Sequence, residues 1–98
     1  SGGGMRVKII EGMALSRPII ASHVAAEGIP VKHGEHILLA DTAEEFTHCI
    51  GTLLEKPAMA QAIGANAHSL VRKQFDSDAI GASLLDFYQK SFWKKEEE

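Results

Sequence analysis

The spacing of apolar residues along the chain predicts two kinds of element. Residues 5–15 are apolar around most of a helical wheel, which predicts a helix that is buried on most of its sides. Pro18 ends this helix, because proline cannot continue a helix and biases the residue before it away from helical backbone. Two short apolar runs without alternation, at residues 18–22 and 36–40, predict strands that are covered on both faces.

Three further helices are expected in the second half of the chain. Thr42 and Glu45 have the spacing of a capping box, which predicts that a helix opens there. Pro57 fits the first position of the next helix, which is expected to run to about Gln74, and Asp76 is expected to cap a last one. The apolar face expected for the first of these helices consists of Phe46, Cys49, Ile50, Leu53 and Leu54. The face expected for the second consists of Met59, Ala62, Ile63, Ala67, Leu70 and Val71, and the face expected for the last consists of Ile80, Leu84, Phe87, Tyr88 and Phe92.

The order of the expected elements defines the fold class. Residues 1–4 and 23–35 are rich in glycine or proline and are expected as loops, the second with a short extended piece at 29–31. Strands alternating with helices favour an α/β, Rossmann-like fold with short parallel strands and several flanking helices. A buried helix that leads into a parallel strand is the second half of a βαβ unit, and the strand before it is missing. Residues 1–98 are therefore interpreted as one domain, cut from a larger α/β protein.

Composition narrows the classes of function. Lys and Arg number 10 against 13 Asp and Glu, and the resulting net charge of -3 argues against the basic surface of a nucleic-acid-binding protein. Cys49 is the single cysteine, so the chain cannot form an intrachain disulfide, and a reducing compartment is expected for the protein. Its side chain is expected to behave as a small hydrophobic group. No apolar run approaches the roughly 18 residues of a membrane span, which favours a cytoplasmic protein.

The candidate binding chemistry lies at the N-terminus. Glycines at 2–4 let an anionic group approach main-chain amides, and the start of the following helix adds N–H groups and the positive end of its dipole. Glu11 lies about six residues further on, or ~9 Å along a helix, which suits a carboxylate that accepts hydrogen bonds from ribose hydroxyls. The spacing is compatible with a nucleoside diphosphate site, but by itself it does not favour that site over a glycine linker or expression remnant followed by an exposed glutamate.

The histidines do not favour a metal site. His33 and His36 flank a glycine in a turn rather than standing one helical turn apart, so we expect no metal there. His23 follows the first strand, at the edge where open α/β sheets bind ligands, and is expected either to line a donor pocket with residues 22–28 or to face solvent. Surface or boundary positions on helices are expected for His48 and His68.

Three segments together resemble a known enzyme family. The stretches GGGMRVKIIEGMALSRPIIAS, EGIPVKHGEHILLAD and SLLDFYQ are similar to the C-terminal end of retaining glycosyltransferases of the GT-B fold, which use nucleotide-sugar donors. The resemblance implies that Glu11 holds the donor ribose and that the backbone amides of Gly3, Gly4 and Met5 face the diphosphate and sugar. It also implies that no metal cofactor is required.

Two cations belong to the same segment. Arg6 and Lys8 are expected beside the diphosphate, where a positive charge stabilises the leaving group, and this makes Arg6 the candidate catalytic residue. The alternative is that both are solvated helix residues, with Lys8 in an ion pair with Glu11 one turn further on.

Three positions depart from the family's pattern. Gly3 stands where a second glutamate is usual, as in a subgroup with a G-G-x-R-x-K segment. Gly12 replaces a common alanine and is expected to loosen the helix by up to about 1 kcal/mol. Ser16 stands where a glycine usually adopts left-handed backbone, so strain or a different cap is expected there.

The preferred interpretation is the C-terminal portion of a donor-nucleotide-binding domain, inactive by itself. Its expected partners are a nucleotide-sugar donor and an absent N-terminal acceptor domain, without nucleic acid, in the cytoplasm or at the inner membrane face. The alternative is a stand-alone, non-catalytic binding or assembly module with half a Rossmann fold. Self-association is also expected, because Trp93 falls opposite the main apolar face of the last helix and a strand edge is left unpaired.

Overall fold

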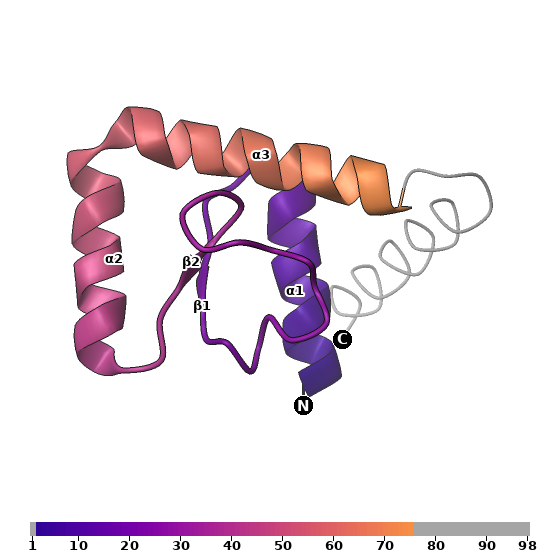
Figure 1. Cartoon of the computed structure of the whole chain (residues 1–98), viewed down its shortest axis with the longest axis horizontal. Helices are drawn as coiled ribbons and strands as arrows, with labels where there is room; N and C mark the ends of the chain where they lie inside the picture. The colour runs from indigo at the N-terminus through magenta and orange to yellow at the C-terminus, as the bar shows by residue number, and fades with distance from the viewer. Residues whose placement is uncertain (1, 76–98) are drawn as a thin grey trace, which may run out of the picture.

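The computed structural model describes residues 2–75, which form three helices and a short parallel sheet (Figure 1). This arrangement confirms the predicted α/β class and is consistent with a fragment of a Rossmann-like domain. The last expected helix, from Asp76 onward, lies outside the described residues. In chain order the elements are α1 (Gly2–Ala14), β1 (Ile20–Ala21), β2 (Leu38–Leu39), α2 (Ala43–Glu55) and α3 (Pro57–Phe75).

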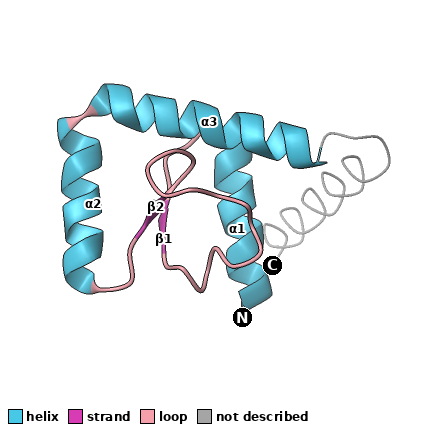
Figure 2. Ribbon diagram, in the orientation of Figure 1, coloured by secondary structure: helices cyan, strands magenta, loops and turns pink. Residues whose placement is uncertain are grey.

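The helices enclose the sheet on both faces. Helices α1 and α2 lie on opposite sides of the strands, and α3 crosses one end of this assembly (Figures 1 and 2). The N-terminal end of α1 and the carboxyl ends of both strands lie at the other end, away from α3 (Figure 1). The fold therefore brings the first turn of α1 and the loops that follow the strands to the same edge of the molecule.

The two strands pair in parallel, with Ile20 opposite Leu38, as predicted. Both are shorter than the apolar runs that predicted them. Pro18 has no N–H to give to a ladder, and the backbone N–H of His36 instead closes a turn by donating to the Lys32 carbonyl at 3.1 Å. His36, at the start of the second run, thus belongs to a turn and not to a strand.

Helix α1 begins at Gly2, so the loop predicted for residues 1–4 is wrong over its glycines. Glycine costs a helix only about 1 kcal/mol per residue relative to alanine, and tertiary packing of the following turns outweighs that cost. The anchoring side chains are Ile9, Ile10 and Met13, which are all buried.

The extended piece expected at 29–31 is also wrong. The Ile29 N–H donates to the Ala26 carbonyl at 3.0 Å and the Val31 N–H donates to the Ile29 carbonyl at 2.7 Å, so the chain turns there. Ile29 is nevertheless buried, and the turn carries it under α1.

The C-terminus of α1 has a complete glycine-type cap built on a serine. Ser16 has a φ of 60°, its N–H donates to the Met13 carbonyl at 3.0 Å, and the Arg17 N–H donates to the Gly12 carbonyl at 3.0 Å. These two bonds are the pair that defines a Schellman motif. The strain expected at Ser16 is confirmed: the usual cap forms with an L-residue in left-handed backbone.

Two clusters of buried side chains fill the space on the two faces of the sheet. One joins α1, the loop after β1 and Ala67 of α3, and the other joins β2, Cys49 of α2 and Ile63 of α3. Ile50 and Leu54 were expected on the apolar face of α2, but their side chains are 49% and 78% exposed. Cys49 lies at the centre of the buried face of α2, and Ile50 and Leu54 lie to one side of it. The buried face of α2 is therefore narrower than the sequence pattern predicts. Ala62 on α3 is exposed for the same reason.

Candidate functional site

The residues predicted to bind a nucleotide lie on the first three turns of α1. Gly3 and Gly4 are in its first turn, where backbone N–H groups have no acceptor four residues earlier within the helix. Met5 is 51% exposed, and Arg6 and Lys8 are exposed as well. Glu11, two turns in, is half-buried. The first two turns of α1 thus expose two cations beside Met5, ahead of the buried Ile9 and Ile10.

Arg6 packs against the loop that follows β1. Its guanidinium carbon lies 3.5 Å from the position that a Cβ would take on Gly28, and Gly28 has a φ of 90°. Gly28 therefore provides both the left-handed backbone and an open surface for the flat guanidinium. The structure brings the predicted leaving-group cation onto residues 22–28, the loop that was expected either to line a donor pocket or to face solvent.

The same loop is fixed at its other end. The Ser22 hydroxyl accepts from the Ala25 N–H at 3.0 Å and the Ser22 carbonyl accepts from the Ala26 N–H at 3.1 Å. Ala26 is buried in the cluster under α1. The loop is therefore held between the carboxyl end of β1 and the side of α1.

His23 and Asp41 form a pair across the carboxyl ends of the two strands. The backbone N–H of His23 donates to Asp41 Oδ1 at 3.0 Å, and His23 Nδ1 lies 2.7 Å from Asp41 Oδ2. The backbone hydrogen bond and then the side-chain bond from His23 hold the pKa of Asp41 below its ordinary value. Asp41 is thus an acceptor that takes both bonds as a carboxylate.

Asp41 is positioned in turn by the first turn of α2. Glu45 Oε1 accepts from the Asp41 N–H at 2.9 Å and from the Thr42 N–H at 3.0 Å, while the Thr42 hydroxyl accepts from the Glu45 N–H at 3.1 Å. This confirms the predicted capping box. The backbone bonds from Asp41 and Thr42 lower the pKa of Glu45.

Sequence reasoning missed the partner of His23. The signal was present, because Asp41 follows the second apolar run as His23 follows the first, and carboxyl ends of parallel strands meet at one edge. The predicted alternative for Lys8 is not observed: within residues 2–75, the ion pairs of the structure do not include one between Lys8 and Glu11.

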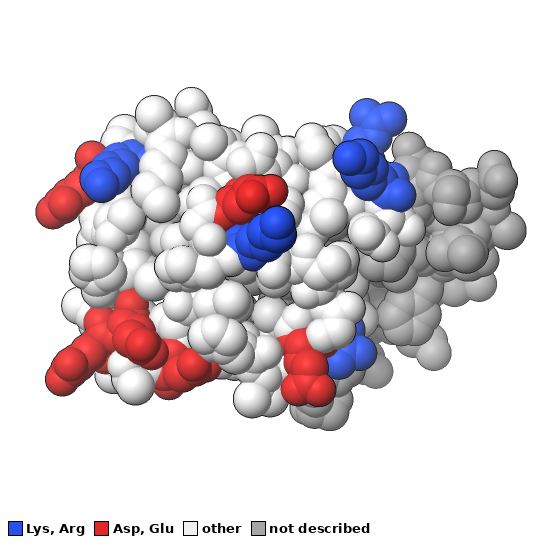
Figure 3. All heavy atoms as spheres, viewed as in Figure 1, with Lys and Arg blue, Asp and Glu red and all other residues white. Residues whose placement is uncertain are grey.

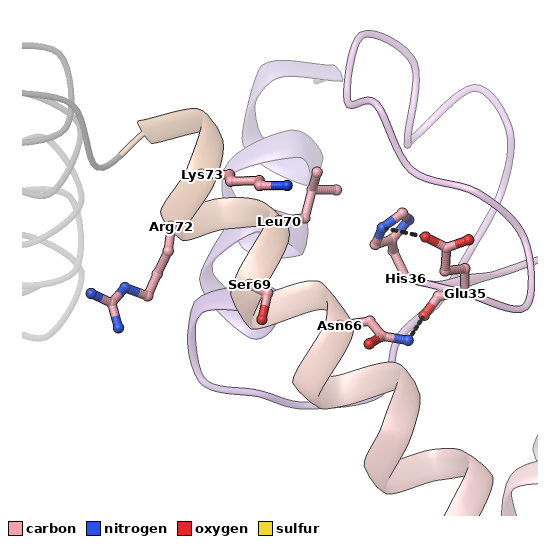
Figure 4. Close-up of a pocket in the computed structure, with 7 residues that line it drawn as sticks. All are labelled: Glu35, His36, Asn66, Ser69, Leu70, Arg72 and Lys73. Atoms are coloured by element: carbon pink, nitrogen blue, oxygen red, sulfur yellow. Dashed lines mark hydrogen bonds and ion pairs between the residues drawn. The ribbon is translucent and has the colours of Figure 1, made fainter.

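A hollow lies at the opposite end of the strands from the His23–Asp41 pair (Figure 4). It has a volume of about 560 Å³ and lies between α3 and the turn before β2. Asn66 Nδ2 donates to the Glu35 carbonyl at 3.0 Å, and His36 Nε2 lies 3.2 Å from Glu35 Oε2. The bond from Asn66 ties the turn to α3, and the contact between His36 and Glu35 lies within the turn.

His33 and His36 serve the backbone of this turn. His33 Nδ1 accepts from the Leu39 N–H at 2.9 Å, and His36 Nδ1 accepts from the Lys32 N–H at 3.1 Å. Among the described residues, no three His, Cys, Asp or Glu side chains gather as metal ligands do. The two histidines therefore act as neutral acceptors that shape the turn.

Charged side chains are dispersed over the face seen in Figure 3. An acidic group lies at the end where α2 begins, and Glu44 and Glu45 stand in the first turn of that helix. Lys and Arg of the described residues occur on this face in small separate groups. No helix in the described part of the chain has the length and apolar character of a membrane span.

The comparisons with known proteins identify the family. Residues 1–56, which include α1, both strands and α2, match the family model described as group 1 glycosyl transferases. The chain therefore belongs to the group 1 glycosyl transferases.

One similar protein comes from Klebsiella pneumoniae. The chain is 23% identical over 85 residues to an "Uncharacterized 44.6 kDa protein in cps region" of Klebsiella pneumoniae, a match that covers 87% of this chain and 22% of that protein. The chain thus spans about a fifth of the length of this relative. No solved structure matches the chain.

Proposed function

We propose that this chain is the nucleotide-sugar-binding segment of a GT-B glycosyltransferase that transfers a sugar with retention of its anomeric configuration. The observation that carries the proposal is the family match over residues 1–56. That range contains the exposed end of α1, the loop after β1 and the His23–Asp41 pair. All three lie at the edge where open α/β sheets bind their ligands.

Each residue at the N-terminal end of α1 has a role in this proposal. The amides of Gly3, Gly4 and Met5 face the diphosphate, where the helix dipole favours negative charge. Arg6, held against Gly28, stabilises the charge that develops on the diphosphate as the glycosidic bond breaks. Lys8 adds a second positive charge on the exposed side of the helix.

Glu11 is the proposed partner of the donor ribose. It stands two turns after the helix start and is half-buried, so part of its surface is open to a ligand. A carboxylate there accepts from both ribose hydroxyls, as acidic residues do in dinucleotide folds. The proposal needs no metal ion, because amides and cations neutralise the diphosphate.

The acceptor site and further catalytic groups belong, in this proposal, to other parts of a longer glycosyltransferase. The chain covers 22% of its Klebsiella relative, which leaves room for an acceptor-binding domain in a protein of that length. Residues 1–98 alone then supply one wall of the donor pocket. We expect weak donor binding and no turnover from this segment by itself.

Substitution of Glu11 tests the proposal in the complete glycosyltransferase. Glu11→Ala should raise the donor KM and lower kcat/KM by about 10- to 100-fold, which corresponds to the loss of about 1.5 to 3 kcal/mol for hydrogen bonds to a charged group. Glu11→Gln should do less harm because it keeps one acceptor. Glu55→Ala, at the far end of α2, is the matched control. Unchanged donor kinetics in Glu11→Ala would make Glu11 a structural residue only.

A further inference from the structure

The His23–Asp41 pair is more ordered than its exposure requires. The two side chains are 65% and 51% exposed, and exposed ion pairs ordinarily contribute little to stability. Here both carboxylate oxygens of Asp41 are engaged by the same residue, one by its backbone N–H and one by its ring. The imidazole is therefore held in one orientation at the surface.

The support for this orientation extends into α2. Glu45 fixes the backbone at Asp41 and Thr42, and Asp41 fixes the ring of His23. The three groups come from the ends of both strands and from the first turn of a helix. These hydrogen bonds hold the His23 side chain in place before any ligand arrives. A binding residue held in this way does not have to become ordered when the ligand binds.

The ring leaves its second nitrogen for an external partner. Asp41 occupies Nδ1, so Nε2 lies on the other side of the imidazole, away from the carboxylate. When both ring nitrogens carry a proton, Nδ1–H donates to Asp41 and Nε2–H donates to an anion on the other side of the ring. Asp41 contacts the ring directly and Glu45 supports Asp41 from behind, while the same loop carries the exposed Glu27 and meets Arg6 at Gly28.

Its position selects a phosphate as the ligand group. The loop from His23 to Gly28 runs from the carboxyl end of β1 to the side of α1, where Gly28 carries the Arg6 guanidinium. Two donors therefore meet this loop near its two ends, the His23 side chain at one end and the Arg6 guanidinium against Gly28 at the other. The carboxyl end of β1 and the first turn of α1 lie at the same end of the molecule (Figure 1). A diphosphate presents acceptor oxygens to donors on several sides at once.

We propose that His23, oriented by Asp41, donates its Nε2–H to a phosphate oxygen of the nucleoside diphosphate part of the donor. This inference rests on the proposed function and assigns a further residue to the same site. His23 is then a substrate-binding residue, and Asp41 is a positioning residue that acts through it.

Two substitutions of His23 separate ligand binding from structure. His23→Asn keeps a donor near the Nδ1 position for Asp41 but has no atom at the Nε2 position, whereas His23→Gln places an amide near Nε2. We expect nucleoside diphosphate affinity to fall about tenfold in His23→Asn and less in His23→Gln. Asp41→Asn should also weaken nucleoside diphosphate binding, because the imidazole of His23 should lose its fixed orientation in this variant. His48→Asn, an exposed histidine on α2, is the control and should bind normally.

The test follows two sets of NMR signals while the 98-residue chain is titrated with UDP, GDP, ADP and inorganic pyrophosphate. One set is the imidazole nitrogens of His23 and the other is the backbone amides of residues 3–6. Shifts of both sets, with the order wild type, then Gln, then Asn in affinity, support the assignment. Shifts of the residue 3–6 amides with an unmoved His23 would overturn it and leave the proposed function standing. If neither set moves, both the assignment and the proposed function are contradicted.

Discussion

The carbonyl oxygen of Ser16 lies directly against Gly64, in the space that a Cβ on Gly64 would fill. Ser16 is the left-handed cap of α1, and Gly64 is buried in the middle of α3. One turn further along α3, His68 Nδ1 lies 3.0 Å from the Ala14 carbonyl and donates to it. The backbone carbonyls of Ala14 and Ser16 thus fix the C-terminal end of α1 against α3. This contact sets where β1 begins and where the N-terminal end of α1 lies relative to the carboxyl ends of the strands.

Replacing Gly64 by alanine should lower the free energy of unfolding by about 2 kcal/mol. The added methyl group would meet the backbone of Ser16, which cannot move without breaking its cap, and overpacking of this kind ordinarily costs 1 to 3 kcal/mol. Gly51 in α2 is the matched control, because nothing lies within 4 Å of a Cβ there and alanine should stabilise by up to about 1 kcal/mol. Urea unfolding of both variants measures this, and equal effects would contradict the contact.

Replacing Ser16 by glycine should stabilise the chain by about 1 kcal/mol. Left-handed backbone costs an L-residue roughly 1 to 2 kcal/mol, and the φ of 60° at Ser16 is one that glycine adopts freely. Arg17→Gly, at the next position, has no such strain to relieve and should destabilise the chain. Thermal unfolding distinguishes the two, and a lower Tm for Ser16→Gly would show that the serine side chain carries the cap.

Much of the fold could be predicted from sequence because its signals are local. The capping box of α2, the proline at the start of α3 and the two apolar runs each act within a few residues. The early start of α1 could not be predicted, because the packing of Ile9 and Met13 on distant elements overrides three glycines. Gly12 was expected only to loosen the helix, whereas a Cβ there would come 2.6 Å from Ile19 Cδ1.

Acid should loosen the start of α2 through Glu45. The pKa of Glu45 is lowered in the folded chain, so the carboxylate contributes its full share to the free energy of unfolding above the ordinary carboxyl pKa. That contribution is lost as the pH falls below about 4 and passes through the lowered pKa of the folded chain. Glu45→Gln keeps an acceptor but does not titrate, so its stability should depend less on pH in this range. Unfolding measured between pH 6 and about 3 tests this. Glu44→Gln, in the same helical turn, should retain the wild-type dependence.

His33 should be a neutral acceptor at Nδ1, with its proton on Nε2. The ring nitrogen receives the Leu39 N–H at 2.9 Å, next to the last ladder position of β2. His33→Ala should therefore lower the free energy of unfolding by about 1 kcal/mol and speed hydrogen exchange at the Leu39 amide. His48→Ala should do neither. A proton found on Nδ1 of His33 in the folded chain would contradict the bond.

The candidate site was predictable only where it lies on one element. Gly3, Gly4, Arg6 and Glu11 follow from the spacing along a single helix and from the family resemblance. The contact of Arg6 with Gly28 joins residues 22 positions apart, and the spacing of the two residues carries no signal of it. The pairing of His23 with Asp41, 18 positions apart, leaves a signal only in the order of the elements, because each residue follows one of the two apolar runs.

The most direct test of the central claim is to map where a nucleoside diphosphate binds this chain. Backbone amide spectra recorded during titration with UDP, GDP or ADP should show the first and largest shifts at residues 3–6 and around Glu11. Because this chain supplies one wall of the donor pocket, binding should be weak and the shifts should require millimolar ligand. Shifts confined to residues 33–36, beside the hollow at the opposite end of the strands, would contradict the account.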